Sequence, residues 1–97
     1  MPLPRYPSVV RDLTLLVNRE VNFAELLQVI DAERIADYSR ATRVGTYEGK
    51  NIPDDKRSVT LRIEYRSDER TLRDEEVEER HRGLIDSLLK KFSAELH

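Results

Sequence analysis

Hydrophobic and polar residues alternate strictly along residues 58–66, the most regular stretch of the chain. One parity is apolar and the other is polar or charged: Val59, Leu61, Ile63 and Tyr65 against Ser58, Thr60, Arg62, Glu64 and Arg66. A period of two residues predicts a strand with one face against a core. The other face has no obvious covering element, so it is either a binding surface or simply solvated.

Two further stretches alternate in the same way. Residues 8–17 form a strand whose odd positions are the more apolar. Residues 36–48 alternate more weakly, with these two parities: Tyr38, Thr42, Val44 and Thr46 against Ala41, Arg43, Gly45 and Tyr47. Turn-forming residues fill 49–55, so residues 36–48 and 58–66 are expected to pair antiparallel.

Two helices are expected from a periodicity near 3.6 residues. The first begins at about Asn22, with Glu25 as a capping-box partner and Val21 placed to pack on Leu26. The second has about twenty residues and ends near Phe92. Its start is open between two caps: Thr71 with Asp74, or Arg73 with Leu72 packing on Val77. Residues 93–97 could add a short final strand.

The order strand, helix, strand, strand, helix, short strand is that of the split βαβ arrangement. We therefore predict an α+β, ferredoxin-like domain over residues 8–97, with a four-stranded antiparallel sheet and both helices on one face. Residues 1–7 contain three prolines and are expected to form an extended arm or linker. Such a start suggests a segment of a longer protein.

Composition narrows the class of protein. The net charge of −2 argues against a uniformly basic binder of duplex backbones. The absence of cysteine removes disulfides and thiolate chemistry and fits a reducing compartment, so the cytoplasm is the expected location. The sequence has neither an apolar run of membrane-spanning length nor a secretion signal, so no membrane partner is expected.

No catalytic pattern is present in the sequence. His81 and His97 lack metal-ligand spacing, and a structural role at the edge of the core is expected for His81. The acidic run 74–79 lacks the spacing of a calcium loop and is typical of a helix start. Gly45 and Gly49 do not form a phosphate-binding loop. We expect no catalytic centre, metal or cofactor in this chain.

Several short motifs occur in a characteristic order: Tyr6-Pro7-Ser8, Arg11-Asp12-Leu13, Tyr47-Glu48-Gly49, Lys56-Arg57-Ser58, and Glu69-Arg70-Thr71-Leu72 followed by Asp74-Glu75-Glu76-Val77. With this order and spacing, residues 6–97 resemble the ferredoxin-fold anticodon-binding domain at the C-terminal end of the bacterial phenylalanyl-tRNA synthetase beta subunit. The resemblance implies that the open sheet face contacts the anticodon stem-loop of tRNA(Phe). It also implies two protein partners, the rest of the beta subunit and the alpha subunit, and places ATP and Mg²⁺ elsewhere in the parent synthetase.

Four residues are the candidate RNA contacts: Tyr47, Arg43, Ser58 and Arg62. An aromatic ring with nearby cations suits single-stranded RNA, provided that these side chains share the open face. In the family, an aromatic residue and an Asp precede the Tyr. Here Val44 and Gly45 take those positions, so a base contact made by that Asp does not transfer.

Other interpretations of these residues stay open. Tyr47 could instead seal the strand end while the arginines merely face solvent, and Arg11 could pair locally with Asp12 to fix the first strand. The family's basic C-terminal motif is also altered at residues 93–97.

Two other function classes share this fold. One is a regulatory or protein-docking module that does not bind RNA. The other is a small acyl- or phosphoryl-transfer enzyme, which would need an anion-binding loop that this sequence lacks.

Overall fold

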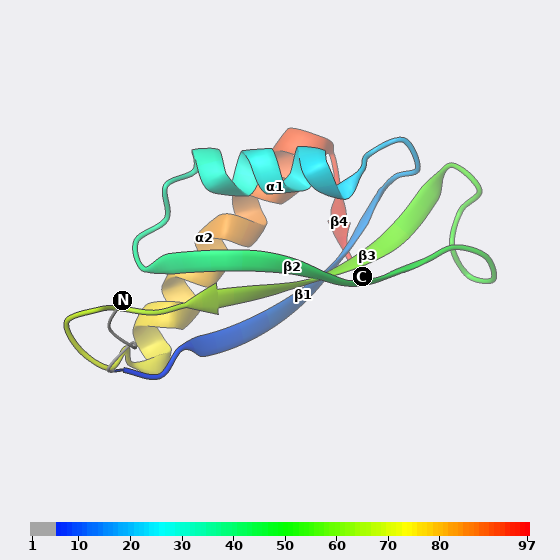
Figure 1. Ribbon diagram of the computed structural model, residues 1–97. Coiled ribbons are helices and arrows are strands. Elements are labelled where there is room, and N and C mark those ends of the chain that lie inside the picture. Colours follow the sequence, from blue (N-terminus) through cyan, green and yellow to red (C-terminus); the bar gives the residue numbers. More distant parts are fainter. Residues whose placement is uncertain (1–5) are drawn as a thin grey trace.

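The computed structural model describes residues 6–97, so most of the predicted arm at residues 1–7 lies outside the described residues. The elements are β1 (Val9–Asn18), α1 (Phe23–Ala32), β2 (Tyr38–Tyr47), β3 (Lys56–Tyr65), α2 (Asp74–Phe92) and β4 (Glu95–Leu96). The sheet order is β2-β3-β1-β4, and every neighbouring pair is antiparallel. Both helices lie on one side of the sheet, and the β2–β3 connection projects beyond them at one end (Figure 1). The predicted ferredoxin-like fold is confirmed.

The core lies between the sheet and the two helices. The apolar parity predicted for β3 is buried, and it joins Leu13, Leu15 and Val17 of β1 in one cluster. Leu84 and Leu88 of α2 belong to the same cluster, and Ile85 packs against it. Burial of these side chains is the main favourable contribution to folding. The strict alternation of residues 58–66 therefore assigned the correct face to the core.

The two helix starts are capped in different ways. Asn22 is the N-cap of α1, and its side-chain oxygen accepts a hydrogen bond from the Glu25 backbone N–H at 2.9 Å. Arg73 occupies the N-cap position of α2, with Leu72 and Val77 buried beside it, so the second of the two predicted caps is the one observed. Neither described helix is both long and apolar enough to cross a membrane.

Two β-bulges make β2 depart from the predicted alternation. The pairing with β3 shifts between Tyr38 and Arg40 and again between Arg43 and Gly45, so that one residue is extra at each place. Paired residues of antiparallel strands share a face. As a result Arg43, opposite Leu61, lies on the helix side, whereas Tyr47, opposite Ser58, lies on the open side. The prediction that Arg43 and Tyr47 share a face is wrong for this reason.

His81 lies inside the core of the domain. Its Nδ1 atom is 3.0 Å from the Tyr65 hydroxyl, and the two rings meet edge to face. Burial lowers the pKa of His81 and raises that of Tyr65 to about 12, so both side chains are neutral near pH 7. The structural role expected for His81 agrees with this geometry.

Glu76 links the start of α2 to the preceding turn, and we expect it to make stability pH-dependent. Its carboxylate accepts hydrogen bonds from the Arg70 guanidinium and from the Arg73 backbone N–H at 2.8 Å. Chiefly through Arg70, these contacts lower the pKa of Glu76 to about 2. A lowered pKa contributes stability that is complete above about pH 4.5 and is lost as the pH falls towards 2.

The replacement Glu76→Gln should therefore lower the melting temperature at pH 7, and the difference from the unmodified chain should shrink steadily between pH 5 and pH 2. Thermal unfolding followed by circular dichroism at several pH values measures both. Glu75→Gln is the matched control, because Glu75 has no ion-pair partner among residues 6–97. A difference that is independent of pH would contradict the assignment.

Candidate nucleic-acid interface

The face of the sheet opposite the helices is built from side chains of β1, β3 and β2 in cross-strand rows. The pairing places the following residues together: Leu16–Ser58–Tyr47, Thr14–Thr60–Gly45, Asp12–Arg62–Thr42 and Val10–Glu64–Arg40, with Asn18–Lys56 beyond the Tyr47 row. No described helix covers this face (Figure 1). This face is therefore accessible to a partner.

In the half of this face farther from Tyr47, positively charged side chains form ion pairs with negatively charged ones. Arg62 donates from Nε and Nη2 to the two oxygens of Asp12, at 3.0 and 3.2 Å. These hydrogen bonds hold the pKa of Asp12 below its usual range and raise that of Arg62. Arg40 donates to Glu64 at 3.0 Å. Both arginines therefore present a compensated charge rather than a free one.

The other half carries no charge in its two central rows, and we call it the uncharged half: Leu16, Ser58, Tyr47, Thr14, Thr60 and Gly45. Tyr47 is 53% exposed and is not part of the core. Among residues 6–97 it is the one aromatic side chain in the exposed class. Lys56 lies next to this half and donates to the neutral side chain of Asn18 at 2.7 Å, so its charge is not compensated by that contact.

The turn after β2 supports Tyr47. The Tyr47 hydroxyl donates to the Lys50 carbonyl at 3.3 Å, and Gly49 has a φ of +120°, which favours glycine. Ile52 in the same turn is buried, and its backbone N–H donates to the Gly49 carbonyl at 2.9 Å. An ion pair of 2.7 Å between Arg19 and Glu48 joins the turn after β1 to the end of β2. The ring is therefore exposed but held by ordered neighbours.

The four sequence-predicted contacts do not form one cluster. Tyr47, Ser58 and Arg62 lie on the open face, and Arg43 lies on the opposite one because of the second bulge. Ser58 is only 6% exposed, between Leu16 and Tyr47 in its row. Of the four, Tyr47 combines the open face with high exposure and no competing ion pair. A role of these residues in RNA binding stays a prediction.

One interpretation of the sequence expected Arg11 to pair with Asp12. In the structure the two side chains instead pair with residues on other elements. Arg11 donates to Glu78 at 2.8 Å and reaches Asp74 at 3.4 Å, so it ties β1 to α2. Asp12 pairs with Arg62 on the opposite face. Each has a structural partner on another element.

Sequence reasoning missed Lys56 and the pair Thr14–Thr60 as site candidates. The signal was available for Lys56 and Thr60, because both have the polar parity of β3. Thr14 belongs to the corresponding parity of β1, and its hydroxyl lies 2.9 Å from that of Thr60. Only the pairing of the two strands brings these hydroxyls together.

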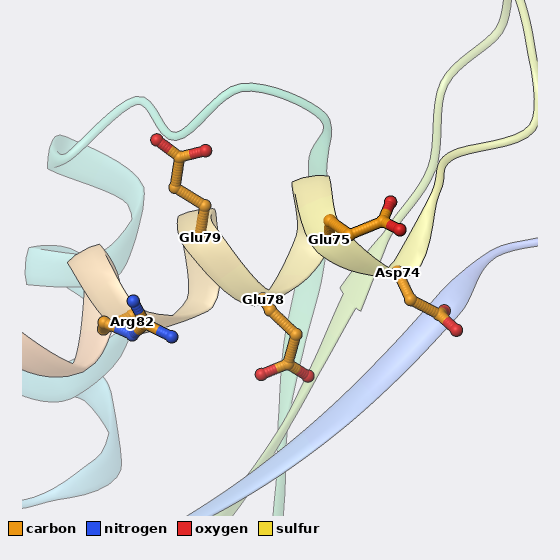
Figure 2. A pocket seen from close by; sticks show the side chains of 5 residues that line it. All are labelled: Asp74, Glu75, Glu78, Glu79 and Arg82. Atoms are coloured by element: carbon orange, nitrogen blue, oxygen red, sulfur yellow. The ribbon is translucent and has the colours of Figure 1, made fainter.

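The start of α2 forms a different surface, on the helix side. An open depression there is lined by Asp74, Glu75, Glu78, Glu79 and Arg82. Figure 2 shows Asp74 and Glu78 directed towards β1, where Arg11 contacts both. The four carboxylates outnumber the nearby cations Arg11 and Arg82, so the surface keeps a negative charge that repels phosphate and does not suit a nucleic acid. These carboxylates are not arranged to bind a metal ion together, and no other group of three or more His, Asp or Glu side chains among residues 6–97 is.

Comparison with known proteins gives one consistent result. The family model for the ferredoxin-fold anticodon binding domain matches residues 4–97. The chain is 36% identical over 94 residues to the phenylalanine–tRNA ligase beta subunit of Syntrophotalea carbinolica, and 37% identical over 94 residues to that of Geobacter sulfurreducens. It is 37% identical over 95 residues to that of Geobacillus kaustophilus. These matches cover 97 or 98% of this chain but only 12% of each relative.

Proposed function

Because the chain belongs to the ferredoxin-fold anticodon binding domain family, we propose that it is the tRNA-binding module of a phenylalanine–tRNA ligase beta subunit. In this proposal the open sheet face contacts the anticodon stem-loop of tRNA(Phe). The remainder of the beta subunit and the alpha subunit are its protein partners in the cytoplasm. Phenylalanine activation with ATP and Mg²⁺ takes place elsewhere in that enzyme, and this domain needs no cofactor.

The observation that carries the proposal is the exposure of Tyr47 on the uncharged half of the open face. An aromatic ring that is half exposed and outside the core is available for a base to stack on. Lys56 lies close enough in the sheet to meet a phosphate of the same strand of RNA. The acidic start of α2 disfavours binding on the helix side. Together these features favour one face and one binding mode.

Titration of the chain with a hairpin RNA that has the tRNA(Phe) anticodon stem and loop tests the proposal. Fluorescence anisotropy should give saturable binding, and a hairpin with the same stem and an unrelated loop should bind more weakly. Equal affinity for both hairpins, or no binding to either, would contradict the proposal. The latter result would favour a regulatory or protein-docking module instead.

The salt dependence of this binding should be shallow. Arg40 and Arg62 are compensated by Glu64 and Asp12, which leaves Lys56 and Lys50 as the lysines near Tyr47 that form no ion pair among residues 6–97. One or two neutralised phosphates predict a slope of log K against log salt of about −0.7 to −1.4 for a single strand. Measuring the affinity at several salt concentrations gives this slope.

The replacement Lys56→Gln should flatten that slope further. Lys90→Gln is the matched control, since Lys90 lies in the last turn of α2 and is exposed away from the sheet face. Two results would mean that the RNA occupies another surface. One is a slope for the unmodified chain several times steeper than the predicted one, and the other is an equal change of slope in Lys56→Gln and Lys90→Gln.

A further inference from the structure

Gly45 leaves a position without a side chain in the middle of the uncharged half. It pairs with Thr60 of β3, which pairs in turn with Thr14 of β1. Apart from Gly45 itself and its two neighbours in the chain, no atom lies within 4 Å of a Cβ atom built at Gly45. The space above this backbone is therefore open, and no side chain from β2 covers Thr60 at this position.

The hydroxyls of Thr14 and Thr60 are 2.9 Å apart and share one hydrogen bond. Two hydroxyls contribute two hydrogens and four lone pairs. Among residues 6–97 neither hydroxyl makes another hydrogen bond, so one hydrogen and several lone pairs have no protein partner. Both side chains are partly buried on the two inner strands, which fixes their positions. Such a pair can donate to, or accept from, a group that approaches over Gly45.

Tyr47 and Thr60 are close enough to contact a single nucleobase. Adjacent strands lie about 5 Å apart, and residues two apart on one strand are separated by about 7 Å. Tyr47 and Gly45 are two residues apart on β2, and Thr60 is opposite Gly45. The hydroxyl end of the Tyr47 ring is directed at the Lys50 carbonyl in the following turn, so a base must stack over the Cβ end of the ring and extend over Gly45 to bring its edge to the hydroxyl pair. Single-stranded RNA is read through such edges.

We propose that the Thr14–Thr60 hydroxyl pair hydrogen-bonds to the edge of the base that stacks on Tyr47, and that Thr60 supplies the hydroxyl for this contact. The inference rests on the function proposed above and names the group of the RNA that is read, an exocyclic oxygen or amino group of one loop base. Hydroxyls contact either kind of group. The Tyr47 ring supplies affinity that is independent of base identity.

A chemical double-mutant cycle tests this inference. The probes are the tRNA(Phe) anticodon hairpin and versions in which one loop base at a time carries hydrogen in place of its exocyclic group. The protein variants are Thr60→Val, which keeps the β-branched shape, and Thr60→Ser, which keeps the hydroxyl. Thr42→Val is the matched control, because Thr42 lies on the same face beside Arg62.

At one loop position, removing the exocyclic group should weaken binding to the unmodified chain about 2- to 10-fold, as expected for one hydrogen bond. Thr60→Val should bind the complete hairpin more weakly than the unmodified chain does, by the same factor. It should bind the altered hairpin no more weakly than it binds the complete one. Thr60→Ser should still bind the complete hairpin more tightly than the altered one. Thr42→Val should bind both hairpins as the unmodified chain does.

Two results overturn the inference. The first is that Thr60→Val lowers the affinity for every hairpin by one common factor, or for none, which would mean that the hydroxyl pair does not contact a base. The proposed function would still hold in that case if the hairpin binds and binding depends on Tyr47. If no hairpin binds the unmodified chain, the proposed function itself fails and the inference fails with it.

Discussion

Replacing Leu61 by Ala should cost about 2 to 5 kcal/mol of unfolding free energy. Leu61 has no exposed surface, lies in the middle of β3, and belongs to the same buried cluster as Leu84 and Leu88 of α2. Removing its side chain loses apolar burial and leaves a cavity that the paired strands on both sides cannot easily close. A domain of this size is stable by only about 5 to 15 kcal/mol, so the variant should unfold in much less urea.

Urea unfolding at pH 7 measures this loss. Leu96→Ala is the matched control, because Leu96 is 57% exposed on β4 and the same replacement there should change stability by less than about 0.5 kcal/mol. Similar costs at the two positions would show that Leu61 does not occupy the centre of the core.

The second large effect concerns Tyr47. If a base stacks on its ring, Tyr47→Ala should lower the affinity for the anticodon hairpin by about 1 to 3 kcal/mol, or about 5- to 150-fold. Tyr47→Phe should lose little, because it keeps the ring and removes only an exposed hydrogen bond to the Lys50 carbonyl. Since Tyr47 lies outside the core, the Ala variant should keep its unfolding free energy within about 0.5 kcal/mol.

Measuring affinity and stability on the same Tyr47 variants separates the two interpretations of this residue. A ring that only sealed the end of the strand would give an Ala variant that melts earlier and binds RNA as before. That combination would remove Tyr47 from the proposed site. The full synthetase can replace the single domain in the binding measurement if the hairpin binds too weakly.

The sequence predicted those parts of the fold that depend on local rules. The alternation in residues 58–66 assigned the correct face of β3, and Asn22 marked the start of α1 through its own side chain. The start of α2 had two candidate caps, and packing of Leu72 beside Val77 accompanies the one observed. Each of these features involves residues close together in the chain.

The face of Arg43 could not be predicted in this way. An extra residue at a bulge reverses the alternation beyond it, and a weakly alternating strand does not show where the extra residue lies. Gly45, beside the second bulge, was the available hint.

Whether the other site candidates are paired or buried depends on residues that are distant in the chain. Arg62 is compensated by Asp12, which lies fifty residues earlier in the chain. Ser58 is buried between residues of two neighbouring strands. Sequence reasoning identified the exposed ring of Tyr47, but it could not show which nearby cations were already paired.

The bulges of β2 also bear on self-association. β2 is an edge strand of ten residues, and a long regular edge invites pairing with a strand of another molecule. Its two irregular positions interrupt the row of backbone groups that such a strand would need, and Arg43, which forms no ion pair among residues 6–97, adds an exposed positive charge to this edge. We therefore expect the irregularity that places Tyr47 on the open face also to disfavour pairing of this edge with a second molecule.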